Sequence, residues 1–415
     1  MHAALIADAD YLDEELPEFR QLCVGLVDEQ VRLTRVVPGA VVRAAPRRGP
    51  ESDRREADAD ADTPRRGDFE RRSPGARRWR TADDPEAGPT HGPLADSPLF
   101  GARLTWEASR FSGLHHRRLV RLAAPLAVAN VTLIHALSRG VWSAAATLGE
   151  QLDAAVVFRA ADWADAEHAA RLVRQLRPTR CVLVASSGPL AAELRRRTQN
   201  LVRVETVFPG VHVEEPRAGG RRPGDPLCVA VAGDGVLDDA YRTLLSGIAQ
   251  VVALHPATQF FFDTPRIDPQ RLWRETQRRG LLGNLSFVPR QPGHRDLLLT
   301  ADALVLPQAS GRTRGVTLRA MARAVPVLAA GDPALDELTH NHTAWVLENP
   351  DAAAWADALI RVVATPDDAN DLGLRARAWV HEERLASDQI GRLLNLYHTM
   401  TGEPIGFVGQ AAEPA

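Results

Sequence analysis

Short apolar runs alternate with amphipathic segments along almost the whole chain, and this alternation limits the fold more than any other feature. Strands of a parallel sheet are covered by helices on both faces, so they read as apolar runs separated by helical segments. The pattern therefore predicts an α/β protein with parallel, doubly wound sheets. The predicted strands are residues 2–7, 36–42, 102–106, 131–136, 154–159, 181–185, 202–207, 227–232, 259–262, 285–288, 303–306, 325–329 and 344–347. Predicted helices include residues 115–129, 139–152, 164–176, 188–199 and 387–399.

Two segments interrupt the alternation and divide the chain. Residues 44–98 mix arginine doublets with acids, proline and glycine, and bury too little apolar surface to offset chain entropy, which predicts a disordered insertion. Residues 214–226 are rich in proline and glycine and predict a linker. The expected organisation is an N-terminal Rossmann-like domain over 1–213, a second over 227–385, a C-terminal helix over 386–402 that packs back on the first domain, and a tail over 403–415.

The charge balance argues against nucleic acid as a partner. The 50 basic residues, all of them arginine, are matched by 53 acids, and the net charge is −3. Even the arginine-rich insertion holds 11 arginines against 12 acids. The absence of lysine indicates a coding bias toward arginine, under which a functional lysine should become arginine and not a carboxylate.

Cysteine usage and hydropathy predict a cytoplasmic protein without a membrane span. Cys23, Cys181 and Cys228 lie too far apart for a CxxC-type motif, and so sparse a set argues against a disulfide framework. Acidic residues near the N-terminus interrupt any signal-peptide core. The most apolar window, residues 119–137, includes Arg121 and is better explained as a buried helix followed by a strand.

Several sequence blocks, in matching order, resemble family 4 (group 1) retaining glycosyltransferases of the GT-B fold. In the first half these blocks are LIHALSRGVWSAAATLG, SSGPLAAELRR and ETVFPGVHV; in the second they are ADALVLPQ, LRAMARAVPVLA and LTHNHTAWVLENPD. The resemblance implies two Rossmann-like domains that face a cleft. It also implies transfer of a sugar from a nucleotide-sugar to a glycan or lipid-linked acceptor, with no metal and no cofactor.

The resemblance places the donor site in the second domain, at a phosphate loop and the helix after it. Such a site stabilises a leaving diphosphate with cations and with the N–H groups of a helix N-terminus. The donor-binding candidates are Arg312, Arg314, Gly315, Val316, Thr317, Arg319, Asp234 and Asp239.

The chain departs from the family pattern at the positions that carry the chemistry. Gly311, or Arg312 if one deletion is allowed, and Arg319 occupy the positions of the two glutamates in the E-x7-E signature. Asp234 and Asp239 occupy those of a basic pair. In the first domain Ala161 stands where the family often has a histidine near the transferred sugar. Asp162 next to it and His135 on a strand are further cleft candidates.

These departures leave two kinds of hypothesis open. In the first hypothesis the charges of the pocket are exchanged, so that Asp–Arg pairs close it or the arginines take over anion binding. In the second, these charges are solvated on a surface loop that has diverged from the family. At the level of function, the chain is either an active glycosyltransferase or a catalytically silent GT-B protein that binds or scaffolds an active enzyme.

Overall fold

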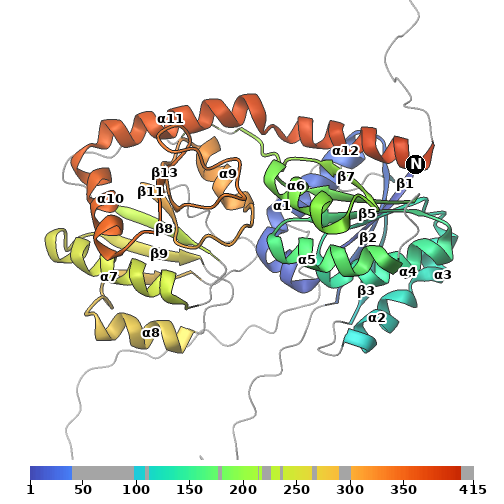
Figure 1. Ribbon diagram of the computed structural model, residues 1–415, viewed down its shortest axis with the longest axis horizontal. Coiled ribbons are helices and arrows are strands. Elements are labelled where there is room, and N and C mark those ends of the chain that lie inside the picture. The colour runs from blue at the N-terminus through green and yellow to red at the C-terminus, as the bar shows by residue number, and fades with distance from the viewer. Residues whose placement is uncertain are drawn as a thin grey trace, which may run out of the picture.

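The computed structural model describes residues 1–39, 98–107, 112–175, 180–213, 215–216, 226–233, 237–263, 269–288 and 301–402. These residues form two lobes, each with its own sheet (Figure 1). Almost all of the predicted insertion and linker, and the whole predicted tail, lie outside the described residues.

The first lobe contains a sheet of parallel strands in the order β3-β2-β1-β4-β5-β6-β7. The order reverses between β1 and β4, which is the point where open α/β sheets bind ligands. Within the described residues the strands are β1 His2–Ile6, β2 Arg32–Pro38, β3 Phe100–Trp106, β4 Leu133–Ala136, β5 Ala155–Ala160, β6 Cys181–Ala185 and β7 Arg203–Thr206.

The second lobe repeats this plan with parallel strands in the order β10-β9-β8-β11-β12-β13. Its reversal lies between β8 and β11, so the two sheets each have one natural binding edge. The strands are β8 Cys228–Ala232, β9 Gln259–Asp263, β10 Leu285–Phe287, β11 Ala303–Leu306, β12 Val327–Ala330 and β13 Trp345–Leu347. The doubly wound α/β architecture predicted from the sequence is confirmed.

Helices cover both faces of each sheet, and buried aliphatic and aromatic side chains fill the space between them. Those of the first lobe are α1 Ala9–Asp28, α2 Ser112–Val120, α3 Ala123–Val128, α4 Trp142–Leu152, α5 Trp163–Leu172 and α6 Gly188–Thr198. The short 3₁₀ segments Arg139–Val141 and Val173–Gln175 adjoin α4 and α5. The second lobe has α7 Asp239–Leu254, α8 Pro269–Arg278, α9 Gly315–Ala322, α10 Ala352–Ala364 and α11 Pro366–Glu383.

The last helix, α12 (Ala386–Thr401), returns to the first lobe and packs on α1 and β4 (Figure 1). Tyr397 of α12 is fully buried there, and its hydroxyl lies 2.6 Å from Nδ1 of His135. Just before α12 the chain crosses the segment that leaves β7, where Val211 N donates to Arg384 O at 2.9 Å. The segment after β7 and the segment before α12, which both run between the lobes, therefore lie side by side.

Two predicted elements differ from the structure. The single helix expected over 115–129 is two helices, α2 and α3, because Pro125 has no N–H to donate to the carbonyl of Arg121 and so belongs to a new first turn. The second strand, predicted at 36–42, spans Arg32–Pro38, and residues 40–42 lie outside the described part of the chain. The sequence pattern places its start too late, because exposed Arg32 and half-buried Arg35 interrupt the apolar run but not the backbone pairing with β1.

Candidate functional site

The carboxyl ends of both sheets face the junction between the lobes. A small cavity of about 30 Å³ lies there, lined from the first lobe by His135, Arg159 and Ser186 and from the second by Thr313 and Gly315. A buried water needs about 10–15 Å³ of such space, so the cavity has room for about two water molecules. In this arrangement the cleft is closed.

Helix α9 begins at this junction with a cluster of cations around its first turn. Its N-cap residue, Arg314, has extended backbone and makes no side-chain cap, so the first N–H groups of the helix are left for other partners. Arg314 is 8% exposed, and among the described residues its Nη2 has no hydrogen-bond partner. Together with Arg312 and Arg319, the helix N-terminus forms a site suited to an anion.

Carboxylates of α1, in the other lobe, occupy this anion site. Glu14 forms an ion pair with Arg312, Glu18 Oε1 lies 3.1 Å from Arg319 Nη1, and Gly315 N donates to Glu15 Oε2 at 3.4 Å. Glu15 is 3% exposed, at a break in α1 two residues before Pro17. Figure 1 shows α1 and α9 on the facing sides of the two lobes.

Burial and charge shift the pKa values of these groups. Burial raises the pKa of Glu18 to about 7, although Arg319 opposes the shift. Burial also lowers the pKa of Arg314, helped by neighbouring Arg312. For Arg312 the effect of burial is outweighed by Glu15, Glu14, Asp162 and Asp165, so its pKa is raised. The cationic wall of the second lobe thus faces an acidic wall of the first.

The pairing of the lobes also explains the glycine at the first E-x7-E position. Gly311 has φ of +68°, and a Cβ on it would overlap the indole ring of Trp163 at the start of α5. Its N–H donates to Asp332 Oδ2 at 2.6 Å. A glutamate would need both a strained backbone and the space that Trp163 occupies.

A second carboxylate crosses the junction in the opposite direction. Asp336 of the second lobe accepts a hydrogen bond from Gly188 N, 2.7 Å away, at the first residue of α6. Each lobe therefore places a carboxylate at a helix N-terminus of the other, where the helix dipole favours negative charge.

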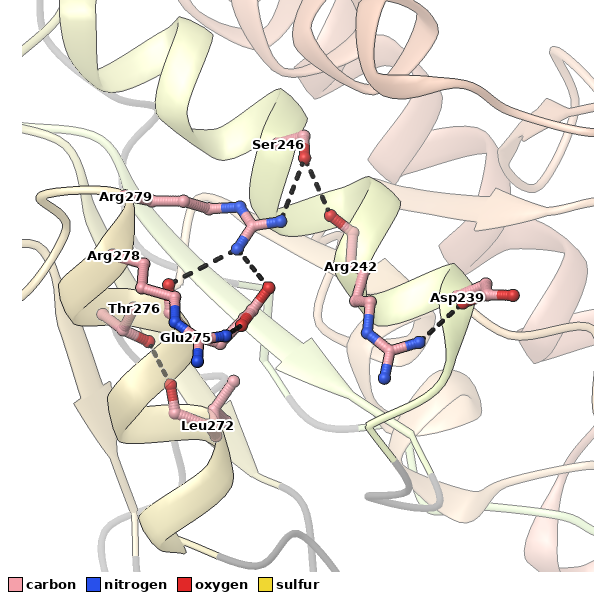
Figure 2. Close-up of polar contacts among 8 residues, drawn as sticks. All are labelled: Asp239, Arg242, Ser246, Leu272, Glu275, Thr276, Arg278 and Arg279. Carbon is pink, nitrogen blue, oxygen red and sulfur yellow. Dashed lines mark hydrogen bonds and ion pairs between the residues drawn. The ribbon is translucent and has the colours of Figure 1, made fainter.

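The predicted Asp–Arg closure takes a different form. Asp239 is 97% exposed at the start of α7 and pairs at 2.6 Å with Arg242 of its own helix, because the first turn of a solvated helix brings positions i and i+3 together. Figure 2 shows this pair on α7, next to polar contacts that join α7 to α8, in which Arg279 contacts both Ser246 and Glu275. Asp234 lies outside the described residues. The acids that meet the arginines come from α1.

The remaining donor candidates lie together on α9. Val316 is half-buried, and buried Thr317 closes the first turn by donating its N–H to Arg314 O at 3.0 Å. They shape the turn and add no charge.

The first-lobe candidates lie at the ends of β4 and β5. His135 is 2% exposed; burial lowers its pKa to about 3, and among the described residues its Nε2 has no hydrogen-bond partner. Ala161 N donates to Asp165 Oδ2 at 2.7 Å, and Asp162 caps α5 by accepting from Asp165 N at 2.8 Å. The turn that would carry a family histidine is thus closed by acids.

The described residues include no group of three or more His, Cys, Asp or Glu side chains that could hold a metal ion. No helix among them is both long and apolar enough to cross a membrane.

The α1 carboxylates are the residues that sequence reasoning missed. Glu14, Glu15 and Glu18 have the i, i+1, i+4 spacing of one helix face, on the helix that directly follows the first strand. An acidic face at the carboxyl end of a central strand, where ligand sites lie, was the available signal.

Two parallel Rossmann-like sheets that face each other across a closed cleft define the GT-B fold. Residues 227–365 match the family model described as Glycosyl transferases group 1. The family predicted from the sequence blocks is thereby confirmed for this part of the chain. In sequence, no curated protein matches the chain.

Solved structures share the fold over nearly the whole chain. Sucrose-phosphate synthase from Thermosynechococcus elongatus is 17% identical, with a TM-score of 0.67 and coverage of 97% of this chain and 100% of that one. A glycosyltransferase from Rickettsia africae is 11% identical, with a TM-score of 0.63 and coverage of 97% and 99%. Anabaena HepE in complex with UDP and glucose is 12% identical, with a TM-score of 0.63 and coverage of 95% and 98%. At these identities the likeness concerns the fold.

Proposed function

We propose that the protein is a retaining glycosyltransferase that moves a sugar from a nucleotide-sugar donor to a glycan or lipid-linked acceptor, without a metal or cofactor. The observation that carries this proposal is the cation cluster at the N-terminus of α9. Arg312, Arg314 and Arg319 surround Gly315 there, and carboxylates of the same chain already bind to three of these four residues. The site therefore binds oxyanions in the structure itself.

A second small hollow continues the anion site into the second lobe. It lies at the carboxyl ends of β8, β11 and β12, and its lining includes Gly233, Gln308, Arg312 and Arg314. This is the edge where open α/β sheets bind nucleotides. The donor diphosphate would lie against the arginines, with its nucleoside toward this hollow and its sugar toward the first lobe.

The chemical contribution of these residues is charge stabilisation. When the bond between the sugar and the diphosphate breaks, negative charge grows on the leaving oxygen, and nearby guanidinium and N–H groups lower the free energy of that state. Arginine suits this role because its guanidinium remains charged and offers several donors in one plane. In this proposal Arg312, Arg314 and Arg319 perform the role of the family's basic pair, whose positions are occupied here by Asp234 and Asp239.

Donor hydrolysis across a panel of nucleotide-sugars tests the proposal. We expect slow release of nucleoside diphosphate from at least one donor, reduced by roughly 10²–10³-fold in Arg319→Ala. Arg242→Ala is the matched control, since that arginine is exposed and pairs with Asp239 on the outer surface. Wild-type protein that neither hydrolyses nor binds any donor would refute the proposal.

The alternative is a catalytically silent GT-B protein that binds or scaffolds an active glycosyltransferase. Its specific support is the closed cleft, with Trp163 over Gly311 and α1 carboxylates on α9. Binding of a donor without turnover, in wild type and in variants with a weakened lobe contact, would favour this alternative.

A further inference from the structure

We propose that Glu14, Glu15 and Glu18 form an intramolecular clasp that competes with polyanionic ligands for the N-terminus of α9 and holds the two lobes closed. Only the identity of the natural ligand rests on the proposed function. The clasp itself is argued from contacts within the chain.

The three carboxylates engage three consecutive parts of one anion site. Glu14 pairs with Arg312 before α9, Glu15 accepts from the first N–H of α9, and Glu18 pairs with Arg319 one turn further on. A clasp with this spacing covers the whole first turn of α9.

The clasp and a ligand cannot occupy the site together. The Glu18 carboxylate lies so close to Gly315 that a Cβ on this glycine would overlap it. The adjoining cavity measures only about 30 Å³. A diphosphate therefore reaches the first turn of α9 only after α1 has moved away.

The clasp leaves the anion site incompletely satisfied, which makes displacement feasible. Among the described residues, the buried Nη2 of Arg314 and the buried Oε2 of Glu18 have no hydrogen-bond partner. A diphosphate bears its oxygens on one small group that is not fixed to α1, so it can reach Arg314 as well. Burial of unpaired polar atoms costs free energy in the closed form.

A second contact between the lobes supports the same closed arrangement. Asp336 accepts from Gly188 N at 2.7 Å, so the lobes are held at two helix N-termini and not at α9 alone. Loss of the clasp should loosen the junction without unfolding either lobe, because each lobe has its own sheet and its own buried core.

The test compares wild type with the variant Glu14→Gln/Glu15→Gln/Glu18→Gln in calorimetric titrations with inorganic pyrophosphate. Glutamine keeps the shape of each side chain and removes its charge. Because the clasp masks the binding-competent form, we expect pyrophosphate to bind the variant at least about tenfold more tightly. Small-angle X-ray scattering without ligand should show a larger radius of gyration for the variant.

Two further variants keep the result interpretable. Glu14→Gln/Glu18→Gln spares buried Glu15, in case the triple variant folds poorly, and should shift both readouts in the same direction. Glu193→Gln removes a half-buried acid that pairs with Arg196 and Arg197 within the first lobe, and should shift neither. Equal affinity and equal radius of gyration in wild type and the folded clasp variants would overturn the proposal. Donor turnover is a separate measurement, so the two proposals can fail independently.

Discussion

Glu18 Oε1 and Arg319 Nη1 lie 3.1 Å apart across the junction of the two lobes. The position of Arg319 belongs to a glutamate in the family pattern, so a negative charge that the family carries on α9 is found here on α1, opposite a cation of α9. An ion pair that is only 30% and 17% exposed on its two sides is less screened than a surface pair, so changes in it should be measurable.

The pH dependence of stability should report on Glu18. Its pKa is raised from the usual 4.5 to about 7 by burial, so the folded protein binds more protons than the unfolded chain between these values. The free energy of unfolding of wild type, measured relative to Glu18→Gln, is therefore highest below pH 4.5 and falls as pH rises through 7. Chemical denaturation at several pH values should show this change, by at most about 3 kcal/mol.

Glu193→Gln is the control for that experiment. Hydrogen bonds from Arg196 and Arg197 lower the pKa of Glu193 to about 2, so its contribution is lost only as pH falls below 4.5. Its difference from wild type should stay flat between pH 5 and 8. If the difference in unfolding free energy between wild type and Glu18→Gln were also flat from pH 5 to 8, Glu18 would not be buried in solution.

Gly311→Ala should destabilise the protein through both its backbone and its contact with Trp163. The φ of +68° costs an alanine roughly 1–2 kcal/mol, and the clash with the indole adds about 1–3 kcal/mol of overpacking. Gly280→Ala isolates the backbone effect, because Gly280 has φ of +70° and open space around its Cβ position. Equal losses in thermal stability for the two variants would argue against the Trp163 contact.

Arg314→Met should separate ligand binding from stability. It replaces a buried cation, one of whose nitrogens is unpartnered, with an apolar chain of similar length, so the ligand-free protein should become more stable by roughly 1 kcal/mol or more. Pyrophosphate binding should weaken about tenfold, since a charge-assisted hydrogen bond is lost. Melting temperature and calorimetric affinity measure the two effects. If Arg314 were structural, stability would fall instead.

Tyr397→Phe should loosen α12 from the first lobe. The change removes the hydroxyl that lies 2.6 Å from His135 Nδ1 and leaves the buried imidazole without a hydrogen-bond partner among the described residues. A buried polar group that loses its partner costs about 1–3 kcal/mol. The same change in a His135→Leu background should cost much less, and an equal cost in both backgrounds would contradict the pairing.

Much of this protein follows from local sequence. Apolar runs flanked by amphipathic segments indicated the parallel sheets, because strand and helix periodicity depend on neighbouring residues. The blocks around ADALVLPQ and LRAMARAVPVLA flank the loop before α9 and include most of α9 itself, and all three arginines of the cluster lie in this loop and helix. The bounds of α2 and α3 were predicted less accurately, since a proline within an apolar segment allows more than one helix boundary.

Only the tertiary structure decided which acids meet those arginines. Asp239, in the same lobe as the site, is exposed to solvent, whereas Glu15 contacts a residue 300 positions away. Such a pairing depends on how two separately folded lobes meet, and no periodicity within α1 or α9 encodes it. The sequence by itself determined the fold and the cations of α9; the packing of the lobes determined that α1 fills the anion site.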